Sequence, residues 1–362
     1  MRTIINKFSV SFLFALCIFL SGCDKNELED IEANVPPKVY IGGITDGTIT
    51  LKSTNKSVQI DKVAKTITAA IGINRSGLQN KDGFSVKIAM TNTGLPAGVV
   101  PVSSSDYMIT SSAGSGAAAT SSIQVPEGES TGTVYLKFSK SLIDANSGKQ
   151  IGFKISISDA SKYEINPDLS SATVIIDVPT FQETQTDITE TYIKNSGSPF
   201  LRVDDGHWNR WGILEDWLVT ASVKNMEGGT KGGFDNNWNG NNGFMSMERW
   251  EDPEVPNGKI YQTMNLPKGR YELVGEFDWA GLNDPGYIVV AEGTSLPDAT
   301  SINSTNTLVN ADLRDKSTVE QLPFVLTSDK QVTIGVSANL INKYQGFRLK
   351  YFKLYSFSSP FD

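Results

Sequence analysis

The chain has 362 residues, with 32 Lys or Arg, 40 Asp or Glu and one His, so its formal net charge at pH 7 is −8. This acidic balance, without a basic stripe, argues against a nucleic-acid partner, because binding to the phosphate backbone needs clustered positive charge. The two cysteines, Cys17 and Cys23, do not provide a disulfide framework for the folded part. The length allows two domains of ordinary size.

Residues 1–22 have the features of a lipoprotein signal peptide. A positively charged start and an apolar run over residues 8–20 precede the lipobox sequence Leu-Ser-Gly-Cys, which ends at Cys23. The apolar run is too short to span a bilayer as a helix. We therefore expect residues 1–22 to be removed and Cys23 to carry lipid; the alternative is a buried thiol beside an ordinary cleavage site. Residues 23–37 are polar and acidic, which predicts a flexible tether.

Residues 38–178 contain short runs of alternating apolar and polar residues, separated by segments rich in Gly, Ser, Asn and Pro. This spacing predicts an immunoglobulin-like β-sandwich. The expected strands cover residues 39–41, 66–73, 84–90, 133–138, 151–157 and 172–178. No cluster of catalytic residue types occurs in this half. Residues 179–187 are predicted to be a linker.

Residues 188–362 predict a second sandwich, of jelly-roll type, so that the whole fold is all-β. The expected strands cover residues 259–266, 270–279, 287–291, 331–337 and 346–357. The first two flank Pro267-Lys268-Gly269 and are expected to form a hairpin. Residues 308–315 are long enough for a short helix at best.

All six tryptophans lie between Trp208 and Trp279, several of them in segments rich in Gly and Asn. Such segments suit sugars, because an aromatic ring covers the C–H face of a pyranose while amides and carboxylates hydrogen-bond its hydroxyls. Packing in the sandwich core is the alternative for each indole, and it is favoured for Trp217. The predicted glycan-binding residues are Trp208, Trp211, Asp235, Asn236, Trp238, Trp250 and Trp279.

The sequence also offers residues for a metal site and for a catalytic site. Asp204 and Asp205 could ligate a structural calcium ion, although Asp-Asp-Gly is also a common turn sequence. The single histidine, His207, cannot build a three-His zinc site. Glycoside hydrolysis needs two carboxylates at a fixed separation, so it stays an alternative. The available carboxylates are Glu215, Glu248, Glu251, Glu276 and Asp278. Because no nucleophile, zinc or nucleotide-binding motif occurs, we do not expect an enzyme.

Several sequence motifs resemble known modules. Val125-Pro126-Glu127-Gly128 and Ile155-Ser156-Ile157-Ser158 resemble an immunoglobulin-like N-terminal domain of unknown function, whereas Leu266-Pro267-Lys268-Gly269-Arg270-Tyr271 and residues 347–355 resemble galactose-binding-type jelly rolls. Together the halves resemble surface lipoproteins of Sus-type polysaccharide-utilisation systems of gut anaerobes. This resemblance implies a non-catalytic outer-membrane protein, lipid-anchored and facing the cell exterior, that captures polysaccharide or oligosaccharide. The alternative it leaves open is a structural subunit that docks onto an outer-membrane glycan transporter.

Overall fold

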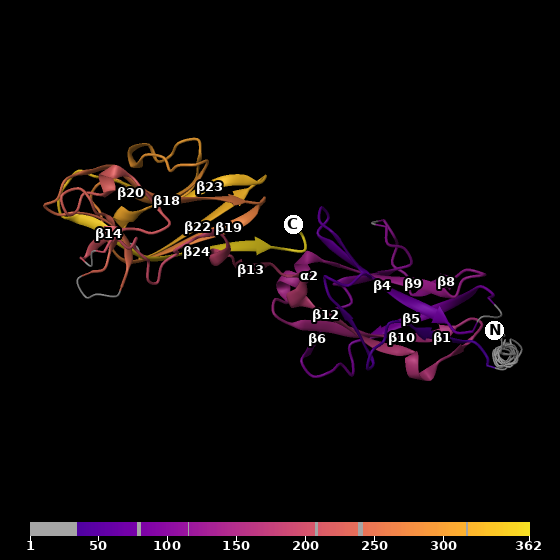
Figure 1. Cartoon of the computed structure of the whole chain (residues 1–362). Helices are drawn as coiled ribbons and strands as arrows, with labels where there is room; N and C mark the ends of the chain where they lie inside the picture. The colour runs from indigo at the N-terminus through magenta and orange to yellow at the C-terminus, as the bar shows by residue number, and fades with distance from the viewer. Residues whose placement is uncertain (1–34, 78–80, 115, 207–208, 238–241, 316–317) are drawn as a thin grey trace, which may run out of the picture. The chain divides into compact units, whose positions relative to one another are not determined.

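The computed structural model describes residues 35–77, 81–114, 116–206, 209–237, 242–315 and 318–362. Cys23, and with it the predicted signal peptide, lies outside these ranges. The chain divides into two compact units, each a β-sandwich (Figure 1). The all-β fold class is confirmed. Within the described ranges, no helix is long and apolar enough to cross a bilayer.

Unit 1 contains two six-stranded sheets. The first has the order β11 (Glu164–Ile165), β1 (Lys38–Ile41), β4 (Thr66–Arg75), β9 (Thr131–Ser139) and β7 (Tyr107–Thr110), with β3 (Val58–Asp61) paired to β4. The second has the order β2 (Thr48–Leu51), β12 (Ser171–Asp177), β10 (Gln150–Ala160), β5 (Phe84–Thr91) and β8 (Ser122–Val125), with β6 (Val99–Pro101) paired to β10. Each of the six strands expected in this half is present. Along β4 every second residue is buried, as period-two alternation requires for a strand with one face on the core.

The segment predicted to be a linker, residues 179–187, is divided between the two units. The 3-10 helix η2 (Val178–Phe181) buries Val178 and Phe181 in the core of unit 1. Strand β13 (Thr184–Asp187) pairs with the last strand of unit 2. The end of the chain also differs from the expected boundaries, because Pro360–Asp362 belong to unit 1 and Phe361 is buried in its core. Polar composition alone does not reveal these long-range contacts.

Unit 2 consists of Glu183–Ser359 and contains only antiparallel strand pairs among its named strands. Its seven-stranded sheet has the order β14 (Trp211–Ile213), β16 (Gly233–Asp235), β17 (Phe244–Arg249), β24 (Gln345–Ser358), β19 (Gly269–Gly281) and β22 (Val319–Leu326), with β13 paired to β24. Its five-stranded sheet has the order β15 (Leu218–Val219), β18 (Val255–Leu266), β23 (Lys330–Leu340), β20 (Gly286–Glu292) and β21 (Thr307–Asp312). Among the residues that the structure describes, the helices are short; the α-helices there are α2 (Lys140–Ala145) in unit 1 and α3 (Thr189–Tyr192) in unit 2.

Two local predictions for unit 2 are wrong. Strands β18 and β19 flank the expected turn, but β18 pairs with β23 and β15, whereas β19 pairs with β24 and β22. The short connection therefore crosses from one sheet to the other and does not close a hairpin. The segment expected as a short helix, residues 308–315, forms most of β21 and the 3-10 helix η5 (Leu313–Asp315).

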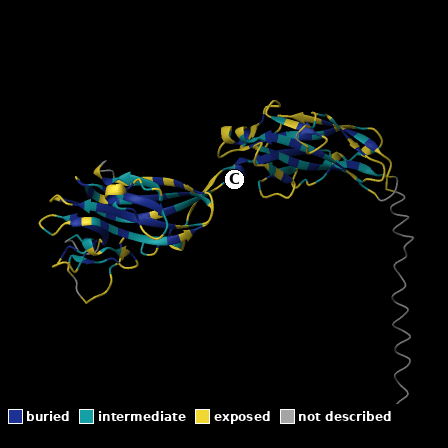
Figure 2. Cartoon of the chain, turned by 90° about the horizontal axis from the view of Figure 1, so that it is seen from above, coloured by how far each residue is buried: buried dark blue, intermediate teal, exposed yellow. Residues whose placement is uncertain are grey.

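The core of unit 2 lies between its two sheets. Figure 2 shows buried residues along the strands of both units and exposed residues mainly in the loops. Trp217 is buried in this core, stacks on Phe352 with ring centroids 5.4 Å apart and donates its indole N–H to the carbonyl oxygen of Asn195 at 2.9 Å. The core role favoured for Trp217 is confirmed.

Candidate functional site

A change of register in β19 places Trp279 on the outer face of the seven-stranded sheet. Leu273 and Phe277 point into the core, and simple alternation would put Trp279 beside them. The pairing with β24 is irregular on both sides of Phe277, and as a result Trp279 lies opposite Arg348. A one-residue slip moves every later side chain to the other face. Trp279 is thus directed away from the core and is half-buried.

Trp279 joins two other aromatic side chains, and we call Trp250, Trp279 and Tyr344 the aromatic platform. The rings of Trp250 and Trp279 are nearly parallel, at 15°, with centroids 6.5 Å apart, and Tyr344 meets Trp250 edge-on at 5.7 Å. Trp250 is 43% exposed and Tyr344 is 58% exposed. Neighbouring exposed aromatic rings of this kind are typical of binding surfaces, where a ligand covers them.

Two glycines make room for the platform on the sheet. A Cβ at Gly281 would lie 2.7 Å from the Trp279 ring, and a Cβ at Gly346 would lie 2.7 Å from the side chain of Glu248. The two glycines lie opposite each other in the β19–β24 pair, and Gly346 also lies opposite Glu248. Two neighbouring positions of this row therefore lack a side chain, which leaves space for Glu248 and for the Trp279 ring.

A buried network of charges lies beside the platform on the same sheet. Arg210 donates to Asp235 at 2.7 and 2.8 Å and to Glu248 at 3.1 and 3.2 Å. Arg348 donates from Nε to Asp235 at 2.8 Å and to Glu248 at 3.2 Å, and its guanidinium lies 5.8 Å from the centre of the Trp279 ring. Glu248 accepts the indole N–H of Trp250 at 3.0 Å. The network therefore contacts both tryptophans.

The two carboxyl groups of this network titrate differently. Burial alone would raise the pKa of Asp235, but hydrogen bonds from Arg210 and from the backbone N–H of Asn237, with the charge of Arg348, hold it below its ordinary value. Burial raises the pKa of Glu248 above its ordinary value, against the opposing charges of Arg210 and Arg348. Both side chains are almost fully buried, Asp235 at 0% and Glu248 at 1% exposure.

The turn that carries Tyr344 is fixed by a buried carboxylate. Asp284 accepts the backbone N–H groups of Ile341 and Asn342, each at 2.6 Å, and the side-chain amide of Gln345 at 2.7 Å. Burial would raise the pKa of Asp284, but these hydrogen bonds outweigh it and lower the pKa below its ordinary value. The turn is thereby held in place, and Tyr344 donates its hydroxyl to Glu251 at its rim.

The other predicted glycan-binding residues have different environments. Trp211 is half-buried under the guanidinium of Arg210, which lies 4.0 Å from the centre of its ring. Asn236 is half-buried on the loop after β16. The carboxylate of Asp235 is buried and shared by two arginines, so it presents no exposed surface to a ligand in this structure. Trp208 and Trp238 lie outside the described residues, as does His207.

The two carboxylates considered for calcium have protein partners. Asp204 accepts the backbone N–H of Gly206 at 3.1 Å, the turn contact that its sequence also predicts. Asp205 forms ion pairs with Arg202, at 3.4 Å, and with Lys231. Within the described ranges no three His, Cys, Asp or Glu side chains are placed to hold a metal ion.

Of the five carboxylates available for hydrolysis, Glu248, Glu251 and Asp278 lie at the platform, whereas Glu276 and Glu215 lie elsewhere. Glu276 accepts from Tyr351 and Lys350, and Glu251 accepts from Lys343 and Tyr344. Asp278 lies 4.0 Å from Arg348 and borders the platform. Glu215 is exposed, and its carbonyl oxygen accepts from the Asn195 side chain.

Three residues of the site were not predicted from the sequence. Arg210 and Arg348 are single basic residues whose partners are distant in the chain, so no local pattern marks them. Tyr344 has a positive φ of 67° in a turn, which is uncommon for a residue with a large side chain. No short motif in the sequence indicates this conformation.

The chain shows limited similarity to known proteins. Residues 194–335 match a family described as a domain of unknown function, DUF5013. No curated protein matches the chain. Among solved structures, the Stig cyclase Fisc from Fischerella sp. TAU is 13% identical, with a TM-score of 0.32 and coverage of 48% of this chain and 98% of its own. A protein of unknown function from Bacteroides ovatus is 10% identical, with a TM-score of 0.30 and coverage of 86% and 93%.

A third solved structure is TmCBM61 in complex with beta-1,4-galactotriose. It is 14% identical, with a TM-score of 0.23 and coverage of 45% of this chain and 96% of its own. At such scores the likeness carries no information on the role of any residue.

Proposed function

We propose that this chain binds polysaccharide or oligosaccharide without cleaving it, through the aromatic platform of unit 2. The observation that carries the proposal is the pair of nearly parallel indoles, Trp250 and Trp279, which is partly open to solvent and is contacted by a network of buried charges. A pyranose ring has an apolar C–H face that an indole can cover. The sugar hydroxyls can then bond to polar groups at the rim, such as the carboxylates of Asp278 and Glu251.

Binding without hydrolysis is favoured by the position of the carboxylates. A glycosidase needs one protonated and one ionised carboxyl group on either side of the scissile bond. The pKa values of Glu248 and Asp235 are shifted in the required opposite directions, but both side chains are buried and bonded to the same two arginines. They support the platform and do not reach a ligand on its surface.

The lipobox that ends at Cys23 supports the further proposal that the chain is a Sus-type lipoprotein, anchored in the outer membrane and facing the cell exterior. Unit 1 then spaces the binding unit from the membrane or docks onto a glycan transporter. One platform binds a sugar weakly, with a dissociation constant of roughly micromolar to millimolar. Many copies on one membrane compensate for this, because each further contact with the same polymer is intramolecular.

The test compares Trp250→Ala with Tyr287→Ala on the full mature chain. Tyr287 is a half-buried aromatic residue on the other sheet of unit 2, so its variant controls for the loss of a ring. A glycan array identifies the polysaccharide, and affinity electrophoresis then measures retention. We expect Trp250→Ala to reduce affinity about fivefold or more, since a stacking contact stabilises by about 1 kcal/mol.

Equal retention of Trp250→Ala and the wild-type protein would show that the platform is not the site. Reducing ends are assayed on the same samples. Their release by the wild-type protein would replace binding with hydrolysis as the function.

A further inference from the structure

The outer face of unit 2 continues beyond the platform along β24. Residues that lie opposite each other in an antiparallel pair share a face of the sheet. Trp279 lies opposite Arg348, and Glu276 lies opposite Tyr351, so all four belong to the outer face. Lys350, in the irregular part of the pair, reaches the carboxylate of Glu276 at 3.2 Å. Polar and aromatic side chains thus follow the strand away from the tryptophans.

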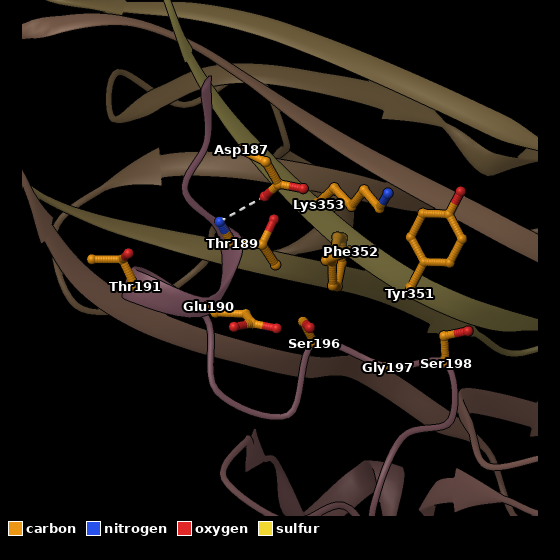
Figure 3. A pocket seen from close by; sticks show the side chains of 10 residues that line it. All are labelled: Asp187, Thr189, Glu190, Thr191, Ser196, Gly197, Ser198, Tyr351, Phe352 and Lys353. Atoms are coloured by element: carbon orange, nitrogen blue, oxygen red, sulfur yellow. Dashed lines mark hydrogen bonds between the residues drawn. The ribbon is translucent and has the colours of Figure 1, made fainter. Parts of the chain in front are cut away.

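This row of side chains ends at a pocket of about 590 Å³ (Figure 3). Strand β17 pairs with β24 over Gln345–Leu349, and β13 pairs over Tyr355–Ser358. Between them the edge of β24 has no full-length neighbour strand. Thr189 and the segment 196–198 contact it there, through hydrogen bonds from Leu354 to Thr189, from Phe352 to Ser196 and from Ser198 to Lys350. The pocket occupies this gap in the sheet edge.

The pocket offers the same kinds of group as the platform. The ring of Tyr351 lies 5.6 Å from the ammonium of Lys353, and Figure 3 shows Lys353 between Tyr351 and Asp187. Ser198 adds a hydroxyl below Tyr351, and Asp187 accepts the backbone N–H of Thr189 at 3.0 Å. An aromatic ring with an amine, a carboxylate and a hydroxyl around it can hold a sugar ring and its hydroxyls.

The row carries charges of both signs. Arg348 lies 4.0 Å from Asp278, and Lys350 pairs with Glu276. The charge of Lys353 lowers the pKa of Asp187, after the larger effect of the hydrogen bonds from Thr189. Three cations therefore lie near three carboxylates, and the exposed Glu190 adds a fourth carboxylate at the pocket. Such a surface does not attract a polyanionic chain, and it offers donors and acceptors to a neutral one.

We propose that the aromatic platform and the pocket of Figure 3 are the two ends of one binding stripe, which holds a neutral oligosaccharide chain along β24. Arg348 and Lys353 are five positions apart, and at about 3.3 Å a residue they lie roughly 16 Å from each other. One sugar cannot contact both ends, whereas a chain of several sugars can. The inference rests on the proposed function, and it specifies the ligand as an extended neutral chain.

The experiment measures affinity by calorimetry for oligosaccharides of increasing length. They are prepared by partial hydrolysis of the polysaccharide that the array identifies, from the disaccharide to the hexasaccharide. We expect affinity to rise with length for the wild-type protein. Tyr351→Ala and Lys353→Ala are each expected to weaken hexasaccharide binding about fivefold and to leave disaccharide binding unchanged. Because Lys353 is exposed, we expect Lys353→Ala to fold even if Tyr351→Ala does not.

Equal affinities for disaccharide and hexasaccharide would overturn the stripe. Wild-type behaviour of Lys353→Ala at every length would do the same, although a loss in Trp250→Ala would leave the proposed function standing. Retention of polygalacturonic acid above that of the neutral polymer would overturn the neutral ligand. If the wild-type protein retains no polysaccharide at all, both the proposed function and the stripe are wrong.

Discussion

The two sandwiches have similar cores and different outer faces. Both cores consist mainly of Ile, Val, Leu and Phe from alternating strand positions. Unit 2 contains all six tryptophans, and among the described residues the buried acidic side chains are also in unit 2. Among the described residues, the large apolar side chains that unit 1 exposes are not aromatic, for example Met108, whereas unit 2 exposes Trp250 and Tyr344. This difference indicates that the core residues determine the sandwich fold, whereas the residues of the outer face determine which ligand a unit can bind.

The buried charges of unit 2 provide the strongest test of this difference between the units. Asp235→Ala leaves the two arginines of the network short of a buried partner, which typically costs about 3–5 kcal/mol. We expect the free energy of unfolding of unit 2 to fall by this amount. Tryptophan fluorescence reports this unit alone, because unit 1 has no tryptophan. Asp159→Ala, which removes the exposed ion pair with Lys87 in unit 1, is the control and should change little. Similar losses in both variants would remove the distinction between the units.

The next largest loss of stability is expected from a change at the end of the chain, and it should affect unit 1. Phe361 is 2% exposed in the core of unit 1, although it follows the last strand of unit 2. Phe361→Ala should lower the stability of unit 1 by about 3 kcal/mol, because it leaves a cavity. Circular dichroism should show this earlier transition while tryptophan fluorescence stays unchanged. A shift in the fluorescence transition instead would mean that the two units unfold as one.

The turn of Tyr344 gives a pH-dependent prediction. The pKa of Asp284 is lower when folded than when unfolded, so its contribution is full above the unfolded value of about 4 and is lost as the pH falls through the folded value. At neutral pH, Asp284→Asn should destabilise unit 2 by about 1–3 kcal/mol, because a buried hydrogen-bonded charge is lost. Thermal melts as a function of pH should show the difference from wild type shrinking in acid. A difference that stays constant down to pH 2 would exclude this role for the carboxylate.

The smallest effect is expected at the glycine under the platform. Gly281→Ala places a Cβ against the Trp279 ring and should tilt it, since the nearest contact would be only 2.7 Å. We expect glycan affinity to fall about threefold while stability changes by about 1 kcal/mol or less. Gly116→Ala in unit 1 is a matched control, because no atom lies within 4 Å of its Cβ. Unchanged affinity in Gly281→Ala would mean that the orientation of Trp279 does not matter for binding.

The sequence predicted the parts of the fold that depend on local pattern. Period-two alternation predicts eleven strands, and the structure has a strand at each of these positions. The sequence also favours a core position for Trp217, which is buried. Very short strands such as β14 and β16 carry too few residues for the pattern to show. Trp250 and Trp279 were among the predicted binding residues, and the structure brings these two together.

Only the tertiary structure decided which strands pair and which faces they share. β18 and β19 are neighbours in the chain but belong to different sheets, and β13 completes its sheet through contacts with the last strand. The irregular pairing at Phe277 directs Trp279 outward, and two distant arginines turn Asp235 from a candidate ligand contact into a buried support. The physical reason is that the alternation of apolar and polar residues depends on neighbouring positions in the chain, whereas register, bulges and ion pairs depend on groups that only folding brings together.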